Sequence, residues 1–151
     1  MGKKNKKAGR MQNPEARGAV AGDNPNAFFN EKPAWQFCLV DKKQWSPLLQ
    51  SKGMADKVIP TMLDYEGMTW KEILAKKKIN HPIDVQKLNR CAIKRLEELS
   101  IEAESLYSLH VQGDQRIYGL VQGDGTFQLI WYDMAHGDTD TCVCRSHKKH
   151  S

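Results

Sequence analysis

The chain has 151 residues, of which 40% are hydrophobic and 27% charged, with a formal net charge of +5 and a pI near 9. This length and composition predict one globular domain and exclude a membrane-spanning helix, because no apolar run approaches the roughly 20 residues that a bilayer requires. We expect no secretory signal, since the basic N-terminus precedes no apolar stretch. Four cysteines without a disulfide-framework spacing predict a reducing, cytoplasmic location.

The first 33 residues have the composition of a disordered basic arm. They hold seven Lys or Arg against three acids and lack apolar periodicity, whereas residues 34–151 hold 16 basic against 15 acidic residues. Both a solvated tail and an electrostatic arm on nucleic acid or the ribosome explain this composition. We predict that the folded domain spans residues 34–138 and that a basic tail containing Cys and His follows over residues 139–151.

The first predicted elements are a strand, a loop and a helix. The apolar run WQFCLV, residues 35–40, has the length of a strand. Residues 44–52 form a predicted loop that Trp45 anchors. Apolar residues at helical spacing predict a helix over residues 54–65, which Pro60 must kink or confine to one side.

Two further helices are predicted before the last third of the chain. The sequence Thr69-Trp70-Lys71-Glu72 is a capping box, which predicts a short helix that ends near Lys78. A longer helix is predicted to begin at Asp84, an N-cap that follows His81-Pro82. Apolar residues then recur every three or four positions from Val85 to Leu99, so one face of this helix is core.

The stretch from Leu106 to His136 predicts a three-stranded antiparallel meander. Runs at 106–111, 116–121 and 127–132 are rich in Val, Ile, Tyr, Phe and Trp, and turns with Gly and Asp separate them. If the earlier strand joins this meander, the chain is an α+β domain. We predict two or three helices on one face of a three- to four-stranded, mainly antiparallel sheet.

The alternation of side chains along these strands predicts that one face of the meander is polar. Two further polar residues follow the last strand in the sequence. We expect Arg116, Tyr118 and Tyr132 to share this face, with Asp133 and His136 directly after the last strand. The opposite face of the last strand is predicted to hold its apolar side chains: Phe127, Leu129 and Trp131.

The residues of the polar face suit RNA cleavage by the adjacent 2′-OH, which requires a base, a cation and an acid but no metal. Arg116 provides a permanent cation, and its planar fork matches phosphate oxygens. His136 exchanges protons near neutral pH, and Tyr118 and Tyr132 can stack a base or act as weak acids. Asp133 either orients His136 or caps the turn. The alternative is structural, with Arg116 paired across strands and Tyr118 in the core.

A block of basic residues predicts contact with nucleic acid. Residues 71–95 hold eight Lys or Arg against two acids, and such a surface attracts phosphate groups. An ordinary solvated helix face explains these charges equally well. The candidate contacts are the basic residues of the longer helix and of the tail: Lys87, Arg90, Lys94, Arg95, Lys148 and Lys149.

The C-terminus gathers four soft metal ligands, Cys142, Cys144, His147 and His150. These residue types hold zinc in many proteins, but C-x-C followed by H-x-x-H is not a usual structural-zinc spacing. We therefore expect no cofactor, and zinc at these four residues is the alternative.

The segment LYSLHVQGDQRIYGLV, followed by a strand that ends in IWYDMAH, resembles the RelE/ParE/HigB superfamily of small toxin proteins. The order strand, helices, meander extends the resemblance over about residues 34–136. Members often cleave mRNA, on the ribosome or free, and a small antitoxin neutralises them. The resemblance implies that Arg116 stabilises the phosphate, that His136 acts as acid or base, and that Lys or Arg of the helices hold the RNA.

The sequence therefore predicts a metal-independent endoribonuclease of the toxin type, with RNA or the ribosome and an antitoxin as partners. One alternative is a non-catalytic module that binds nucleic acid or the ribosome. The other is a protein-interaction domain, in which Trp35, Trp45 and Trp131 contribute to a groove for the partner.

Overall fold

The computed structural model describes residues 27–135 and 142–144. Most of the basic arm and several candidate site residues lie outside these ranges. The candidates outside them are His136, His147, Lys148, Lys149 and His150.

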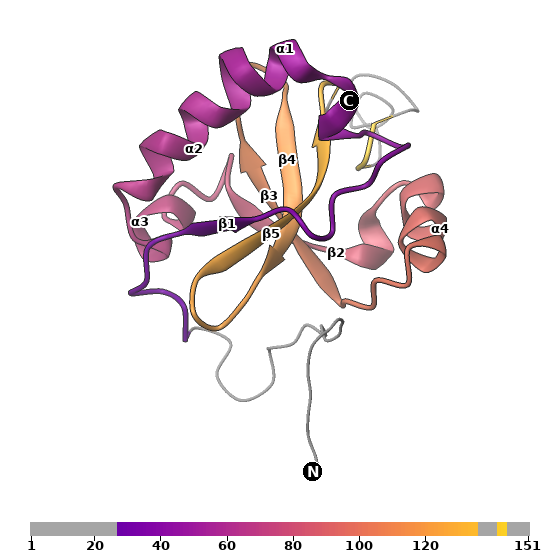
Figure 1. Ribbon diagram of the computed structural model, residues 1–151. Helices are drawn as coiled ribbons and strands as arrows, with labels where there is room; N and C mark the ends of the chain where they lie inside the picture. The colour runs from indigo at the N-terminus through magenta and orange to yellow at the C-terminus, as the bar shows by residue number, and fades with distance from the viewer. Residues whose placement is uncertain (1–26, 136–141, 145–151) are drawn as a thin grey trace.

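A five-stranded mixed sheet forms the centre of the molecule (Figure 1). Its strands, in spatial order, are β1 (Ala34–Gln36), β5 (Thr126–Asp133), β4 (Arg116–Val121), β3 (Ser105–His110) and β2 (His81–Asp84). β1 runs parallel to β5, and the other neighbouring strands are antiparallel. The α+β class and the meander β3–β4–β5 are thus confirmed, and the sheet has one strand more than predicted.

Positive backbone torsions fall where the two turns of the meander need them. Gly113, between β3 and β4, has φ +57°, and Gly125, between β4 and β5, has φ +93°. Only glycine adopts these torsions without a steric cost from Cβ, so the two turns fix where each strand ends.

One continuous helical segment precedes the sheet's central strands and contains a π-helical turn. It consists of α1 (Ser51–Gly53), the π-helical η2 (Met54–Val58) and α2 (Ile59–Glu66). The N–H of Ile59 donates to the carbonyl of Met54, five residues earlier. Because Pro60 has no N–H, the wider turn directly before it lets the helix continue. The predicted helix is confirmed, and it begins three residues earlier than expected.

The predicted capping box is present at the start of α3 (Trp70–Leu74). The Thr69 hydroxyl accepts from the Glu72 N–H at 3.3 Å, and the Glu72 carboxylate accepts from the Thr69 N–H at 2.8 Å. The fully buried Trp70 donates its indole N–H to the carbonyl of Gly125 at 2.8 Å. The helix ends at Leu74, four residues before the predicted end.

The predicted helix start at Asp84 is wrong. Asp84 ends the edge strand β2, a 3₁₀ turn η3 (Val85–Lys87) follows, and α4 spans Arg90–Glu98 with Asn89 as its N-cap. An edge strand tolerates Pro82, which has no N–H for the ladder. The apolar spacing still gives the correct core face, because Ala92 and Leu96 of α4 are buried.

The first strand is shorter than predicted, and the packed part of the chain begins earlier. β1 ends at Gln36, and the chain then turns so that the N–H of Val40 donates to the carbonyl of Phe37. Phe28 lies before the predicted domain boundary but is only 5% exposed, and its ring packs edge-on against that of Trp70.

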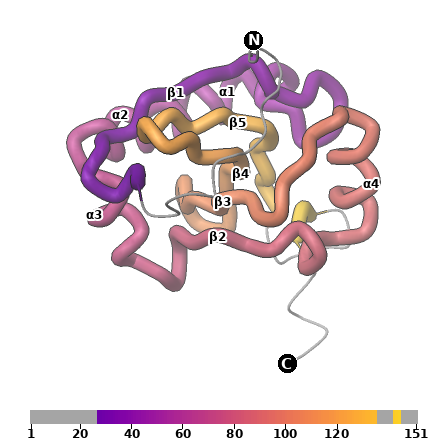
Figure 2. The backbone as a smooth tube through the Cα atoms, turned by 90° about the horizontal axis from the view of Figure 1, so that it is seen from below, coloured from indigo at the N-terminus to yellow at the C-terminus, as the bar shows by residue number. Residues whose placement is uncertain are grey.

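Helices cover both faces of the sheet, so the predicted two-layer arrangement is wrong. The segment α1–α3 lies on one face and α4 on the other, as Figures 1 and 2 show. Each face has its own core cluster. Among the described residues, no helix has both the length and the apolar character that crossing a membrane requires.

A β-bulge in β5 decides which side chains enter which cluster. Tyr118 pairs with Trp131 but Gly119 pairs with Leu129, so Ile130 is an extra residue on β5. An extra residue reverses the alternation beyond it. Phe127 and Leu129 therefore face α1–α3, whereas Trp131 faces α4. The prediction that these three share a face is wrong.

Candidate functional site

Three polar residues lie in a row across the end of the sheet. The Cα atom of Arg116 on β4 is opposite His110 on β3 and opposite Asp133 on β5. Directly opposed residues share a face of a sheet, so we name these residues the His110–Arg116–Asp133 row. His110 is not among the residues that the sequence patterns predicted for the site. The short connection between its strand and β4 is the signal that places it opposite Arg116.

His110 and Arg116 share a hydrogen-bond acceptor at the turn between β3 and β4. Nη1 of Arg116 donates to the carbonyls of Gln115 at 3.0 Å and Gly113 at 3.4 Å. Nε2 of His110 lies 3.1 Å from the same Gly113 oxygen. Both side chains are half-buried. A permanent cation and an imidazole are thus adjacent at the rim of the sheet.

Asp133 has the structural role that the sequence analysis offered as an alternative. It is only 1% exposed, and its oxygens accept from the N–H groups of Ala135 at 2.9 Å and Val143 at 2.8 Å. Burial raises the pKa of this carboxyl group, and the two hydrogen bonds and the charge of Arg116 oppose that rise. Asp133 therefore caps the end of β5 and holds residues 142–144.

Residues 142–144, predicted to belong to a basic tail, are buried between β5 and α4. The N–H of Asn89 donates to the carbonyl of Val143 at 2.8 Å, and its side-chain amide donates to the carbonyl of Cys142 at 3.0 Å. Leu88 forms a β-bridge with Cys144. These contacts connect the row to the first residues of α4 (Figure 1).

The two tyrosines of the predicted polar face lie on opposite faces of the sheet. Tyr118 is fully buried in the cluster under α4. Tyr132 is 1% exposed in the cluster under α1–α3, and its hydroxyl donates to the side-chain oxygen of Gln115. Burial raises the pKa of both phenols. Because neither ring is accessible, the predicted stacking of a base on them does not fit this structure.

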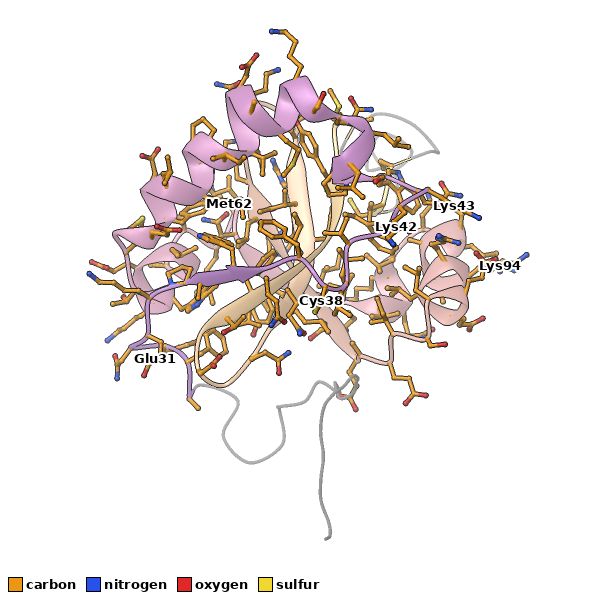
Figure 3. The ribbon with its side chains drawn as sticks, in the orientation of Figure 1. Glu31, Cys38, Lys42, Lys43, Met62 and Lys94 are labelled. Atoms are coloured by element: carbon orange, nitrogen blue, oxygen red, sulfur yellow. The ribbon has the colours of Figure 1, made fainter. Side chains whose placement is uncertain are left out.

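Arg95 differs from the other predicted nucleic-acid contacts on and beside α4. Lys87, Arg90 and Lys94 are exposed, and Figure 3 shows Lys94 pointing away from the helix into solvent. Arg95 turns inward and forms two hydrogen bonds of 2.8 Å with Asp41, through Nε and Nη2. Arg95 is therefore occupied by a structural ion pair.

Asp41 is the buried partner that the sequence analysis missed. It is 0% exposed and also accepts from the indole N–H of Trp131 at 2.9 Å and from the N–H of Lys43 at 2.9 Å. Burial alone would raise the pKa of Asp41, but the hydrogen bonds from Arg95, Trp131 and the backbone outweigh it and hold the pKa well below 3.8. Asp41 thus joins the loop after β1 to α4 and β5.

The cysteines of the candidate zinc site are buried thiols. The Cys142 thiol donates to the carbonyl of Cys144 at 2.6 Å, and burial raises the pKa of Cys144 to about 11. Within residues 27–135 and 142–144, His, Cys, Asp and Glu form no group of three that could hold a metal ion. The two histidines of this candidate lie outside those ranges.

A cleft of about 320 Å³ opens beside the end of β5. Lys43, Trp45 and Asp133 are among its lining residues. Trp45 has φ +46°, an uncommon torsion for a residue with a side chain, and its carbonyl accepts from the N–H of Tyr132 at 2.9 Å. The cleft therefore has one cationic side chain and an aromatic ring within reach of the row.

The three tryptophans proposed as a partner groove do not gather. Trp131 is fully buried, and the half-buried Trp45 packs edge-on against it at 5.0 Å between ring centroids. Trp35 lies on the other face, where it packs against Trp70 and Phe127.

Comparison of the chain with protein-family models, with curated proteins and with solved structures finds no significant match.

Proposed function

We propose that this chain is a metal-independent endoribonuclease of the toxin type, with His110 and Arg116 at its centre. The observation that carries the proposal is that these two side chains lie directly opposite each other and contact the same carbonyl oxygen, that of Gly113. A half-buried Arg beside a His at the open end of a sheet combines phosphate recognition with proton transfer.

The chemistry follows from the roles of these two groups. The imidazole of His110 takes the proton from the 2′-OH, and the 2′ oxygen forms a bond to phosphorus. Arg116 stabilises the negative charge that develops on the phosphate oxygens. The bond from phosphorus to the 5′ oxygen breaks, and a second acid protonates that oxygen. His136 is the sequence-based candidate for this acid. The products are a 2′,3′-cyclic phosphate and a 5′-OH.

The contacts of residues 142–144 support a path for the RNA. Asp133, opposite Arg116, binds Val143, and Asn89 binds Val143 in turn. The exposed Lys87 and Arg90 flank Leu88 and Asn89 in the sequence. Lys87 and Arg90 are thus next in sequence to the residues that contact segment 142–144, and this segment contacts Asp133 of the row. Their charges suit the phosphates next to the one that is cleaved.

The resemblance to the toxin superfamily makes the ribosome and a small antitoxin protein the partners that we propose beside RNA. The four cysteines are thiols and none is in a disulfide, which fits a reducing cytoplasm.

The test incubates the purified protein with a long single-stranded RNA in EDTA, free and on ribosomes, with Arg116→Ala and His110→Ala beside the wild type. We expect the wild type to leave 2′,3′-cyclic phosphate ends and either variant to lower the rate by about 100-fold or more. Arg116→Lys keeps the charge but not the planar fork, so we expect an intermediate rate.

His81→Ala is the matched control for His110→Ala. His81 is also half-buried on a strand of this sheet, but it lies on β2 opposite Ser108 and is not part of the row. Cleavage that survives Arg116→Ala, or that requires added metal, contradicts the proposal. RNA that the protein binds at low salt but does not cleave, whether the RNA is free or on ribosomes, favours the non-catalytic binding module instead.

A further inference from the structure

The large hydrophobic side chains that are exposed are not scattered over the surface. Among the described residues six are exposed, and five of these lie on the turn after β1, on the 3₁₀ helix η1 (Pro47–Leu49) or on α2. These five are Phe37 (52% exposed), Leu48 (61%), Leu49 (66%), Ile59 (46%) and Leu63 (62%).

Three of these side chains line an apolar groove of about 440 Å³. The turn after β1 forms one wall through Phe37, and η1 and the start of α2 form the other through Leu48 and Ile59. Leu63 lies four residues beyond Ile59, and Ala55 four residues before it. This spacing places the three on one stripe of the helical segment, about 12 Å long.

The groove residues contribute little to the core of the fold. Phe37, Leu48, Ile59 and Leu63 belong to neither core cluster, because the inner face of α2 uses Val58, Met62 and Tyr65 instead. Contiguous exposed apolar surface of this kind marks an interaction site.

Positive charge lies on one side of the groove, on the turn after β1. Lys42 is the one charged residue among those that line it, and Figure 3 shows it on the turn after β1, beside Lys43. The helical segment itself carries two lysines, Lys52 and Lys57, against three acids, Asp56, Asp64 and Glu66, and Lys52 pairs with Asp56 at 2.8 Å. The net positive charge of the rim is therefore that of Lys42 and Lys43 on the turn after β1.

This charge selects among the candidate occupants. Residues 1–26 of this chain hold six Lys or Arg against two acids, so they share the sign of the rim. A separate protein segment with apolar and acidic faces complements both features of the groove.

We propose that the groove binds an acidic amphipathic helix of a separate protein. Such a helix presents apolar side chains three or four residues apart, which matches the stripe of Ala55, Ile59 and Leu63. Its acidic residues then face Lys42 and Lys43. This interaction does not depend on the proposed RNA cleavage, since the groove and the His110–Arg116–Asp133 row share no residue.

The test selects ligands for the immobilised full-length protein from a phage-displayed library of helical peptides of about 16 residues, or four turns. We expect enriched peptides with apolar residues at i, i+3 or i+4 and i+7 and with a net negative charge. A synthetic copy of the best peptide should bind the Ile59→Lys variant about tenfold more weakly or worse.

Two further variants make this result specific. Met134→Lys, at the exposed hydrophobic residue outside the groove (43% exposed), should bind the peptide as the wild type does. Leu48→Lys places a lysine at a second, more exposed position of the groove and should weaken binding as Ile59→Lys does. Circular dichroism verifies that each variant is folded. Lys42→Glu should weaken binding and reduce its dependence on salt.

Four outcomes overturn the proposal. They are a selection without enrichment, enriched peptides that are neutral or basic, binding that neither Ile59→Lys nor Leu48→Lys weakens, and a dimer of the wild type in sedimentation that Ile59→Lys dissociates. The last outcome identifies a second copy as the occupant.

Discussion

Arg95 illustrates at the scale of one residue how burial changes the role of a charge. On the helix it repeats with Arg90 and Lys94 as part of a basic surface, yet only its side chain reaches Asp41. The pair is bidentate, and its carboxylate is fully buried. Removing one partner of a buried ion pair leaves the other charge buried and unpaired, which destabilises the fold. Arg95 therefore contributes to stability.

We predict that Arg95→Ala lowers the free energy of unfolding by about 3 to 5 kcal/mol, because it leaves the carboxylate of Asp41 buried without its ionic partner. Denaturation in urea, followed through tryptophan fluorescence, measures this loss. Arg90→Ala is the matched control on the same helix, and its exposed side chain predicts a change within about 0.5 kcal/mol. Equal effects of the two substitutions would contradict the structural role of Arg95.

The lowered pKa of Asp41 predicts a specific pH dependence of stability. The pKa in the folded state lies below the ordinary value of 3.8, so between the two values the unfolded chain binds the proton and folding is weakened. The stabilisation is complete above pH 3.8 and is lost as the pH falls further. The difference in unfolding free energy between wild type and Asp41→Asn should therefore be constant near neutral pH and shrink below pH 3.8. A difference that stays the same in acid would refute this assignment.

At the scale of the element, the bulge in β5 determines what each face of the sheet contains. One extra residue, Ile130, separates Trp131 from Leu129 and brings Tyr132 beneath the helical segment. Gly119 lies opposite this irregularity, and a Cβ there would come within 2.2 Å of the carbonyl oxygen of Gln128. The absence of a side chain at Gly119 is what allows β5 to approach β4 this closely.

We predict that Gly119→Ala lowers the free energy of unfolding by about 1 to 3 kcal/mol, because the strands must separate to accommodate the methyl group. Thermal or urea denaturation measures the loss. Gly123→Ala is the matched control, since an added Cβ there meets no atom within 4 Å. If the substitution at Gly119 proved as mild as the control, the close approach of the two strands would be wrong.

At the scale of the whole molecule, charge and apolar surface lie in different places. Lys87, Arg90 and Lys94 form an exposed basic surface on one side of the sheet, whereas the apolar groove lies between the turn after β1 and the first part of the helical segment. The row of His110, Arg116 and Asp133 crosses the end of the sheet and shares no residue with either region. If both proposals hold, separate surfaces would let the RNA and the protein partner bind at once.

Replacing Lys87, Arg90 and Lys94 together with Gln should weaken binding of single-stranded RNA and lower the slope of log K against log salt by about 2, since each lost phosphate contact removes about 0.7. Fluorescence anisotropy over a salt series measures the slope. Replacing Lys76, Lys77 and Lys78, which are equally exposed but follow α3, is the matched control. A slope that the first triple variant leaves unchanged would exclude these residues as RNA contacts.

Local signals in the sequence predicted those parts of the fold that depend on neighbouring residues. The capping box at Thr69, the glycine turns of the meander and the buried spacing of Ala92 and Leu96 are all present. The position of Arg116 on β4 was predictable, and that of His110 opposite it was accessible from the same strand register. The start of α4 was missed because Asp84 has the residue type of an N-cap, whereas the strand pairing of β2 with β3 decides its conformation.

The sequence alone determined the α+β class, the meander and the basic character of α4, because propensity, turn chemistry and periodicity act over a few residues. Only the tertiary structure decided that helices cover both faces, that Tyr118 and Tyr132 separate, and that Arg95 belongs to Asp41. Each of these depends on contacts between distant segments, and a single extra residue in β5 reverses the faces without altering the composition of the strand. Strand register and burial therefore placed the side chains from which any function of this chain must be built.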